Sequence, residues 1–319
     1  MSSNQKTNTN NVSNWLYKLG PVMALLVLVI VISIFNPSFL QVSNILNLLR
    51  QVSINALIAF GMTFVIITGG IDLSVGSVLA LSSAFSAGFM VSGMNAILAV
   101  TLGLLMGAVF GLISGLLITK GKMAPFIATL ATMTIYRGTT LVFTGGNPVT
   151  GLGDSYFFQL LGKGYVYGIP IPVIIMVIVF IILSIVLHKT SFGRKIYAVG
   201  GNERAANIAG INTDRVKMSV YAISGFLSSL AALILTSRLN SAQPTAGEAY
   251  EMDAIAAVVL GGTSMSGGRG TMWGTLVGAL LIGTINNGLN LMGVSSFYQQ
   301  IVKGIVIIVA VLLDRRRDD

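Results

Sequence analysis

The side chains that could do chemistry in this chain are a few ionisable residues set inside apolar segments. Asp72 follows two glycines and opens one such segment, Arg137 lies late in another, and Lys303 lies within the last one. Ionisable groups at membrane depth are costly, so each could contact a transported solute, a counter-charge or water. The structural alternatives are an N-cap carboxylate for Asp72, which we favour, and snorkelling to the interface for the two cations. A capping role would not exclude a pathway role for Asp72.

Three amides, Asn286, Asn287 and Asn290, cluster in one apolar segment. Positions 286 and 290 are one helical turn apart and share a face. These amides could meet sugar hydroxyls in a transport pathway. The alternative is hydrogen bonding between helices, a common use of Asn in membranes, and we favour it. With Asp72 and Arg137, these amides are the candidate pathway or gating residues.

A polar, basic stretch between two apolar segments could pass force to a soluble partner. Asn202 is a good N-cap, Glu203 suits the positive start of a helix, and Gly210 is a good stop, so the pattern predicts a helix over 203–209. The alternative is an ordinary connector. The helix would present a low-profile face to a partner's groove through two alanines, Ala205 and Ala206.

Sequence signatures of catalysis are missing from the chain. It has no G-x-x-x-x-G-K-[ST] phosphate loop, no H-E-x-x-H zinc motif and no G-x-S-x-G nucleophile elbow. It has no cysteine and one histidine, which leaves no thiolate or multi-histidine metal site. We therefore predict no catalytic residue, no metal and no cofactor in this chain.

The composition is that of a polytopic membrane protein. Of 319 residues, 54% are hydrophobic and 9% are charged, whereas soluble chains carry about 25% charged residues. A helix needs about 20 apolar residues to cross a bilayer. We predict an all-α helical bundle with about ten transmembrane segments, one of them of only half length (252–262). The ten segments are 20–36, 45–68, 72–92, 95–119, 124–144, 169–188, 216–237, 252–262, 271–292 and 297–313.

Positive charge orients these segments. With ten crossings and the N-terminus inside, the three basic clusters all fall on the cytoplasmic side, as the positive-inside rule requires. These clusters lie at 120–122, 189–217 and 315–317. We therefore place both termini in the cytoplasm. The predicted domains are a polar cytoplasmic tail, 1–18, and a transmembrane domain, 19–319, with a cytoplasmic coupling loop at 189–215.

Two glycine-rich breaks follow apolar runs in the two halves of the chain. One contains Gly69 and Gly70, and the other contains Gly261 and Gly262. Similar breaks in both halves suggest an internal repeat, as many transporters have.

On the extracytoplasmic side of the membrane, the polar stretch 241–248 could bind an extracytoplasmic protein or simply be solvated.

These stretches together resemble the permease subunits of bacterial ATP-binding-cassette (ABC) sugar importers, over nearly the whole chain. The resemblance implies the ABC importer permease fold, a location in the bacterial inner membrane, and transport of a pentose such as ribose. It also implies three kinds of partner: an ATPase that binds ATP and Mg²⁺, an extracytoplasmic sugar-binding protein, and a second permease copy in a homodimer. The loop that matches 202–210 is the coupling helix of such permeases. The resemblance is carried by 61–76, 125–130, 198–203, 241–247, 254–264, 286–291 and 293–296.

The resemblance further implies alternating access driven by a separate ATPase. Galactose, xylose, arabinose and autoinducer permeases carry similar motifs, so the sugar is less firmly indicated than the family. A secondary transporter driven by an ion gradient is an alternative, and the small number of intramembrane acids argues against it.

Overall fold

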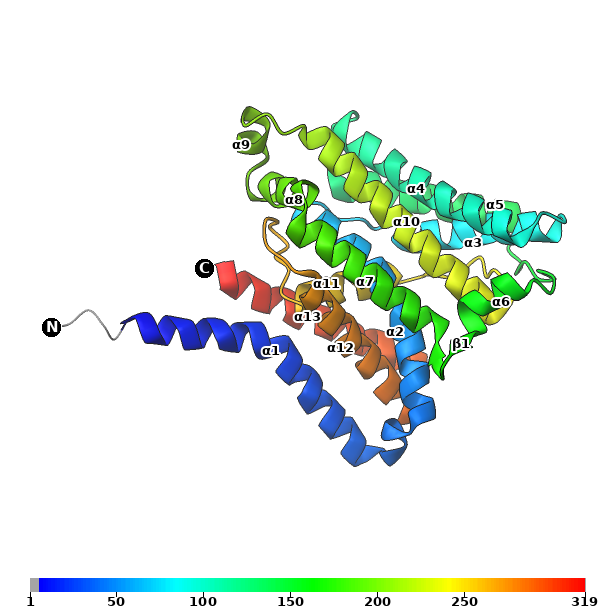
Figure 1. Ribbon diagram of the computed structural model, residues 1–319, viewed down its shortest axis with the longest axis horizontal. Coiled ribbons are helices and arrows are strands. Elements are labelled where there is room, and N and C mark those ends of the chain that lie inside the picture. The colour runs from blue at the N-terminus through cyan, green and yellow to red at the C-terminus, as the bar shows by residue number, and fades with distance from the viewer. Residues whose placement is uncertain (1–5, 319) are drawn as a thin grey trace.

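The computed structural model describes residues 6–318, with side-chain surroundings for 20–309 and 311–312 (Figure 1). Residues 1–5 of the expected polar tail lie outside the described part, and helix begins at Lys6. The all-α prediction is confirmed. The elements are α1 (Lys6–Phe35), η1 (Pro37–Leu40), α2 (Val42–Ile67), α3 (Val75–Val91), α4 (Ala96–Thr119), α5 (Pro125–Thr144), α6 (Tyr156–Lys163), β1 (Tyr165–Val166), β2 (Ile169–Pro170), α7 (Ile171–Lys189), α8 (Ser191–Gly201), α9 (Glu203–Ile208), α10 (Thr213–Leu239), α11 (Tyr250–Leu260), α12 (Met272–Leu291) and α13 (Ser296–Asp318).

Each of the ten expected apolar segments is a helix, namely α1 to α5, α7 and α10 to α13. Within the described residues, α2, α4, α5, α7 and α10 are long and apolar enough to cross a membrane. The half-length prediction is confirmed for α11, which has 11 residues. Between the expected spans, the structure adds α6, α8 and a two-strand hairpin of β1 and β2. We call the two ends of the bundle the α9 end and the α6 end (Figure 1).

The two halves of the chain repeat one packing arrangement. In the first half, α2 leads through a break into α3, and α4 and α5 follow. In the second half, α10 leads through a loop into α11, and α12 and α13 follow. The central helices α2 and α10 pack against each other, α4 packs on α10, and α12 packs on α2. The internal repeat is therefore present, but it pairs the break before α3 with the loop 240–249 before α11. It does not pair the two glycine-rich breaks with each other.

The two halves have opposite orientations because their leading helices run antiparallel. Gly70, after the end of α2, lies against Tyr221 near the start of α10, whereas Gly61 lies against Ser224 and Leu227 further along α10. Inverted repeats of this kind place discontinuous helices near the middle of the membrane.

A stripe of glycines on α4 allows its close approach to α10. Gly107, Gly111 and Gly115 are spaced four residues apart and lie on one face. A Cβ atom at any of them would overlap backbone atoms of α10 or lie within 3.0 Å of them. Small residues at this spacing let membrane helices pack backbone to backbone, because the hydrophobic effect provides no force between helices in lipid.

We expect Gly111→Val to destabilise the bundle, because the added methyl groups would overlap the backbone of Tyr221. Overpacking of this kind typically costs about 1–3 kcal/mol of unfolding free energy. Thermal denaturation of the purified protein in detergent measures the effect. Gly138→Val is the matched control, since no atom lies within 4 Å of a Cβ at that helical glycine. Equal melting temperatures for the two variants would contradict the proposed close approach.

Candidate functional site

The break between α2 and α3 is held by Asp72, which is 1% exposed. One carboxylate oxygen, Oδ1, accepts the backbone N–H of Ser74 at 3.0 Å and the Ser74 hydroxyl at 2.6 Å. The other, Oδ2, accepts the hydroxyl of Ser224, near the middle of α10, at 2.8 Å. The predicted N-cap role of Asp72 is wrong in position, because α3 begins at Val75 and its N-cap is Ser74, although the carboxylate does accept the expected N–H of Ser74.

A tyrosine from α10 completes the support of this break. The Tyr221 hydroxyl donates to the carbonyl oxygen of Ile71 at 3.0 Å, and its side chain is fully buried. Gly70 lies against this hydroxyl, where a Cβ atom would come within 2.6 Å. Gly69 adopts a φ of +77°, which other residues rarely tolerate. The glycines of this break are thus explained by a tight turn and by contact with α10.

The loop 240–249 is folded into the bundle, which corrects the expectation of a solvated or docking loop at 241–248. Ala242 is 1% exposed and pairs with Val149 as an isolated bridge. Arg137 donates from one terminal nitrogen to the carbonyl oxygens of Pro244 at 2.6 Å and Ala246 at 3.0 Å. Arg137 is thus held by backbone carbonyls, which neither alternative from the sequence foresaw.

The two half-helices begin at the same place. A Cβ atom on Gly76, in the first turn of α3, would overlap the carbonyl oxygen of Gly247, which precedes α11. A Cβ on Gly247 would lie 2.6 Å from the carbonyl oxygen of Gly76. The N-terminal ends of α3 and α11 therefore meet inside the bundle. Such paired half-helix ends occur at transport sites in membrane proteins.

Lys303 anchors α13 to the first turn of α11. Its Nζ lies 2.8 Å from Oδ2 of Asp253, a carboxylate that is 4% exposed. The ion pair gives the buried carboxylate a partner, and Asp253 alone would be strongly destabilising as an unpaired buried charge. Lys303 therefore has a structural partner in a different helix.

The second glycine-rich break folds back onto the first. The N–H of Gly268 donates to the carbonyl oxygen of Ile67, the last residue of α2, at 2.9 Å. Gly261 packs on the backbone of Gly274 so closely that a Cβ atom would overlap it, and Gly262 adopts a φ of +86°. The two breaks are distant in sequence and adjacent in space.

The predicted coupling helix is present as α9, one residue shorter than expected. Its N-cap is Asn202, whose side chain accepts the N–H of Ala205 at 3.0 Å, and Gly210 follows with a φ of +83°. Glu203 is paired with Lys217 at 2.6 Å. The expected alanine face is wrong for Ala206, which is 5% exposed and packs into the core, whereas Ala205 is exposed.

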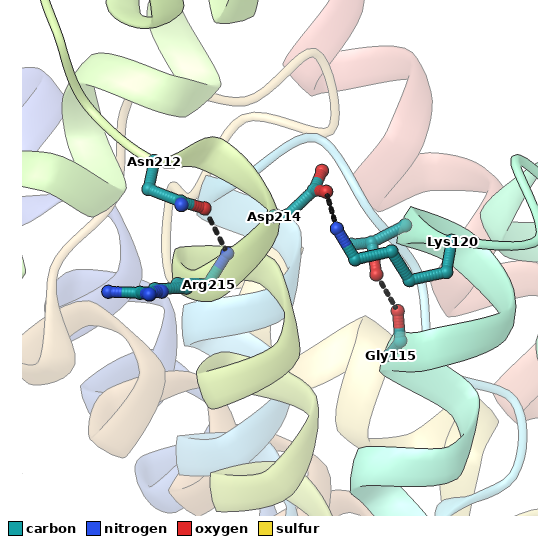
Figure 2. A network of polar contacts seen from close by, with 6 residues as sticks. Gly115, Lys120, Asn212, Asp214 and Arg215 are labelled. Atoms are coloured by element: carbon teal, nitrogen blue, oxygen red, sulfur yellow. Dashed lines mark hydrogen bonds and ion pairs between the residues drawn. The ribbon is translucent and has the colours of Figure 1, made fainter.

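The outward face of α9 instead carries Ile208, which is 89% exposed. A depression of about 330 Å³ lies beside it, lined by Asn207, Gly210, Ile211, Asn212, Thr213 and Asp214. Figure 2 shows the start of α10 at this depression, where Asn212 caps the N–H of Arg215 at 3.0 Å and Asp214 pairs with Lys120 at 2.7 Å. This exposed ion pair links the start of α10 to the residue that follows α4.

The three amides of α12 lie apart from this site. Asn287 exchanges hydrogen bonds of 3.0 Å with Asn44 of α2, and Asn290 accepts from Gln299 of α13 at 2.8 Å. The interhelical interpretation is confirmed for both. Asn286 is 6% exposed, and its side-chain oxygen has no hydrogen-bond partner among the described residues. Among the described residues, none of the three amides hydrogen-bonds to Asp72 or Arg137.

Sequence reasoning missed three residues of the site: Tyr221, Ser224 and Ile208. Tyr221 and Ser224 lie three residues apart, so they share the face of α10 that meets the first break. Polar groups at this spacing inside an apolar helix were the available signal. Ile208 could have been noticed as a large apolar residue in a short polar helix.

We expect Asp72→Asn to melt close to the unmodified protein, because the amide oxygen can still accept the N–H of Ser74. Asp72→Ala should lose about 1–3 kcal/mol of unfolding free energy, because the buried donors of Ser74 and Ser224 lose their acceptor. Thermal unfolding in detergent compares the two. If Asp72→Asn were as unstable as Asp72→Ala, the charge rather than the acceptor would be what the break requires.

Comparison with known proteins agrees with a transport subunit. A family described as the permease component of the branched-chain amino acid transport system matches residues 44–311. The ribose import permease RbsC of Bacillus subtilis is 70% identical over 300 residues, covering 94% of this chain and 93% of the relative. The RbsC protein of Escherichia coli K12 is 51% identical, covering 95% of each chain.

Relatives named for other sugars are more distant. The D-allose permease AlsC of Escherichia coli K12 is 42% identical, covering 93% of this chain and 91% of the relative. No solved structure matches the chain. The family match spans most of the chain, and the first relatives align along nearly their whole length. The chain therefore belongs to this family of transport-system permease components, as a membrane-spanning subunit without an enzymatic activity of its own.

Proposed function

We propose that this chain is the pathway subunit of an ABC importer that carries ribose. The observation that carries the proposal is the high identity with permeases named for ribose, which exceeds the identity with the permease named for allose. The helix interruptions inside the bundle support a transport function, because discontinuous helices that meet inside an inverted repeat are typical of transporters. The sugar moves by alternating access between the two faces of the membrane.

A second copy of the chain completes the pathway. The faces of α5 and α13 that this chain leaves uncovered carry polar residues among apolar ones, including exposed Thr134 and Thr139. Each threonine hydroxyl donates to a carbonyl of its own helix, so the helix tolerates lipid or a partner equally. A pathway between two copies would use such a mixed surface.

The orientation follows from the basic residues. The bundle spans the inner membrane of a bacterial cell, and its α9 end faces the cytoplasm. This end carries the basic residues Lys120, Arg194, Arg204 and Arg215. The α6 end receives sugar from an extracytoplasmic binding protein. ATP and Mg²⁺ are bound by a separate ATPase subunit at the cytoplasmic face.

The ATPase binds α9. Ile208 is an apolar anchor on an otherwise polar surface, and the depression next to it can receive a side chain of the ATPase. Interface energy commonly concentrates in a few anchors of this type, surrounded by polar contacts that exclude water. Asn202 and Gly210 fix the ends of α9 and therefore the direction in which the anchor points.

We expect Ile208→Asp to weaken copurification of the ATPase by at least about tenfold, the scale of a lost interface anchor. The variant should insert and fold normally, because the side chain is 89% exposed. Tyr167→Asp, at a fully exposed position on the α6 end, is the matched control and should leave ATPase binding unchanged. Undiminished copurification and uptake with Ile208→Asp would rule out this anchor.

The transported sugar is tested by uptake into proteoliposomes. They would contain this chain with the ATPase and the binding protein encoded beside it, labelled ribose outside and ATP inside. We expect uptake that requires all three proteins and that excess galactose, xylose or arabinose does not compete. ATP-dependent uptake of a different sugar would replace the substrate and keep the mechanism. Uptake that an ionophore abolishes and that survives without ATP would indicate a secondary transporter.

A further inference from the structure

The backbones of three separate segments meet at Gly200, in the last turn of α8. A Cβ atom on Gly200 would overlap the carbonyl oxygen of Ile67, at the end of α2, and would lie 2.6 Å from the nitrogen of Gly268. From the other side, a Cβ on Gly267 would lie 3.0 Å from the carbonyl oxygen of Gly200 and 3.0 Å from the nitrogen of Gly69. The end of α8 therefore touches both glycine-rich breaks at once.

Hydrogen bonds close this junction. The Tyr197 hydroxyl of α8 donates to the carbonyl oxygen of Gly270 at 2.7 Å, and the N–H of Gly268 donates to the carbonyl oxygen of Ile67 at 2.9 Å. The second break is thus tied to α8 on one side and to α2 on the other.

The helix α8 is itself seated in the core and joined to α9 by a single residue. Ile196 is fully buried and Val199 is 2% exposed. Asn202 ends α8 and is also the N-cap of α9. A displacement of α9 must therefore move α8, because one residue leaves little length in which to absorb it.

We propose that α8 transmits movement of α9 to both glycine-rich breaks together, through the backbone contact at Gly200 and the hydrogen bond of Tyr197. Close-packed interfaces pass on a displacement rather than absorbing it. One break leads to Asp72 and α3, and the other joins the end of α11 to the start of α12. A single movement at α9 thereby reaches both inverted halves. This inference rests on the proposed binding of the ATPase at α9.

Two adjacent glycines of α8 provide the test. Gly200→Ala forces the three backbones apart, whereas Gly201→Ala is the matched control, since no atom lies within 4 Å of a Cβ there. Each variant would be assembled with the ATPase and the binding protein in proteoliposomes. The readouts are copurified ATPase, ATP hydrolysis, and sugar taken up per ATP hydrolysed, all counted per assembled complex.

We expect Gly200→Ala to bind the ATPase and hydrolyse ATP as before, while uptake per ATP falls about tenfold, because overpacking of this size displaces the contact. Gly201→Ala should behave as the unmodified protein. Normal uptake per ATP with Gly200→Ala, or equal losses in both variants, would overturn the proposal. Absence of ATPase binding by the unmodified protein would instead refute the proposed function.

Tyr197→Phe tests the same proposal if the Gly200→Ala variant does not assemble with the ATPase and the binding protein. It removes the hydroxyl that reaches Gly270 and keeps the ring, so folding should survive. We expect a several-fold loss of uptake per ATP, with ATPase binding unchanged. Tyr156→Phe is the control, because that tyrosine is 77% exposed at the α6 end. Uptake per ATP equal to that of the control would overturn the proposal.

Discussion

The structure depends on one constraint, which is that backbone groups freed inside a membrane bundle must be paired within the protein. Both glycine-rich breaks and the loop 240–249 interrupt helices and so free carbonyl and N–H groups. Each interruption has a polar side chain from another segment that reaches its backbone. The Tyr221 hydroxyl donates to the carbonyl oxygen of Ile71, and Arg137 donates to the carbonyl oxygens of Pro244 and Ala246. The polar side chains inside the bundle are therefore explained first by the backbone groups to which they hydrogen-bond.

This constraint changes the meaning of the polar candidates. Asp72 and Arg137 are candidate pathway residues by sequence, and in the structure Asp72 holds the first glycine-rich break while Arg137 holds the loop 240–249. The point at which α3 and α11 begin is fixed by the contact of Gly76 with Gly247.

The sequence predicts the helices well because hydrophobic length and caps are local properties. All ten apolar segments and the capped helix α9 follow from them. The loop 240–249 was misjudged because polar composition suggests solvent, whereas its carbonyls are satisfied by Arg137, distant in the chain. Gly200 was unremarkable in sequence because its neighbours, Ile67 and Gly268, come from other segments. Long-range backbone contacts leave no periodic signal, and the structure was needed to find them.

The most direct test of the central claim is a pair of distances in the assembled importer, measured by electron spin resonance. The chain has no cysteine, so labels can be placed at Gly201→Cys with Trp273→Cys, and at Gly201→Cys with Tyr167→Cys. All three positions are exposed. The account predicts that ATP binding leaves the distance from α8 to the start of α12 unchanged and changes the distance from α8 to the α6 end. A change in the first distance without a change in the second would contradict it.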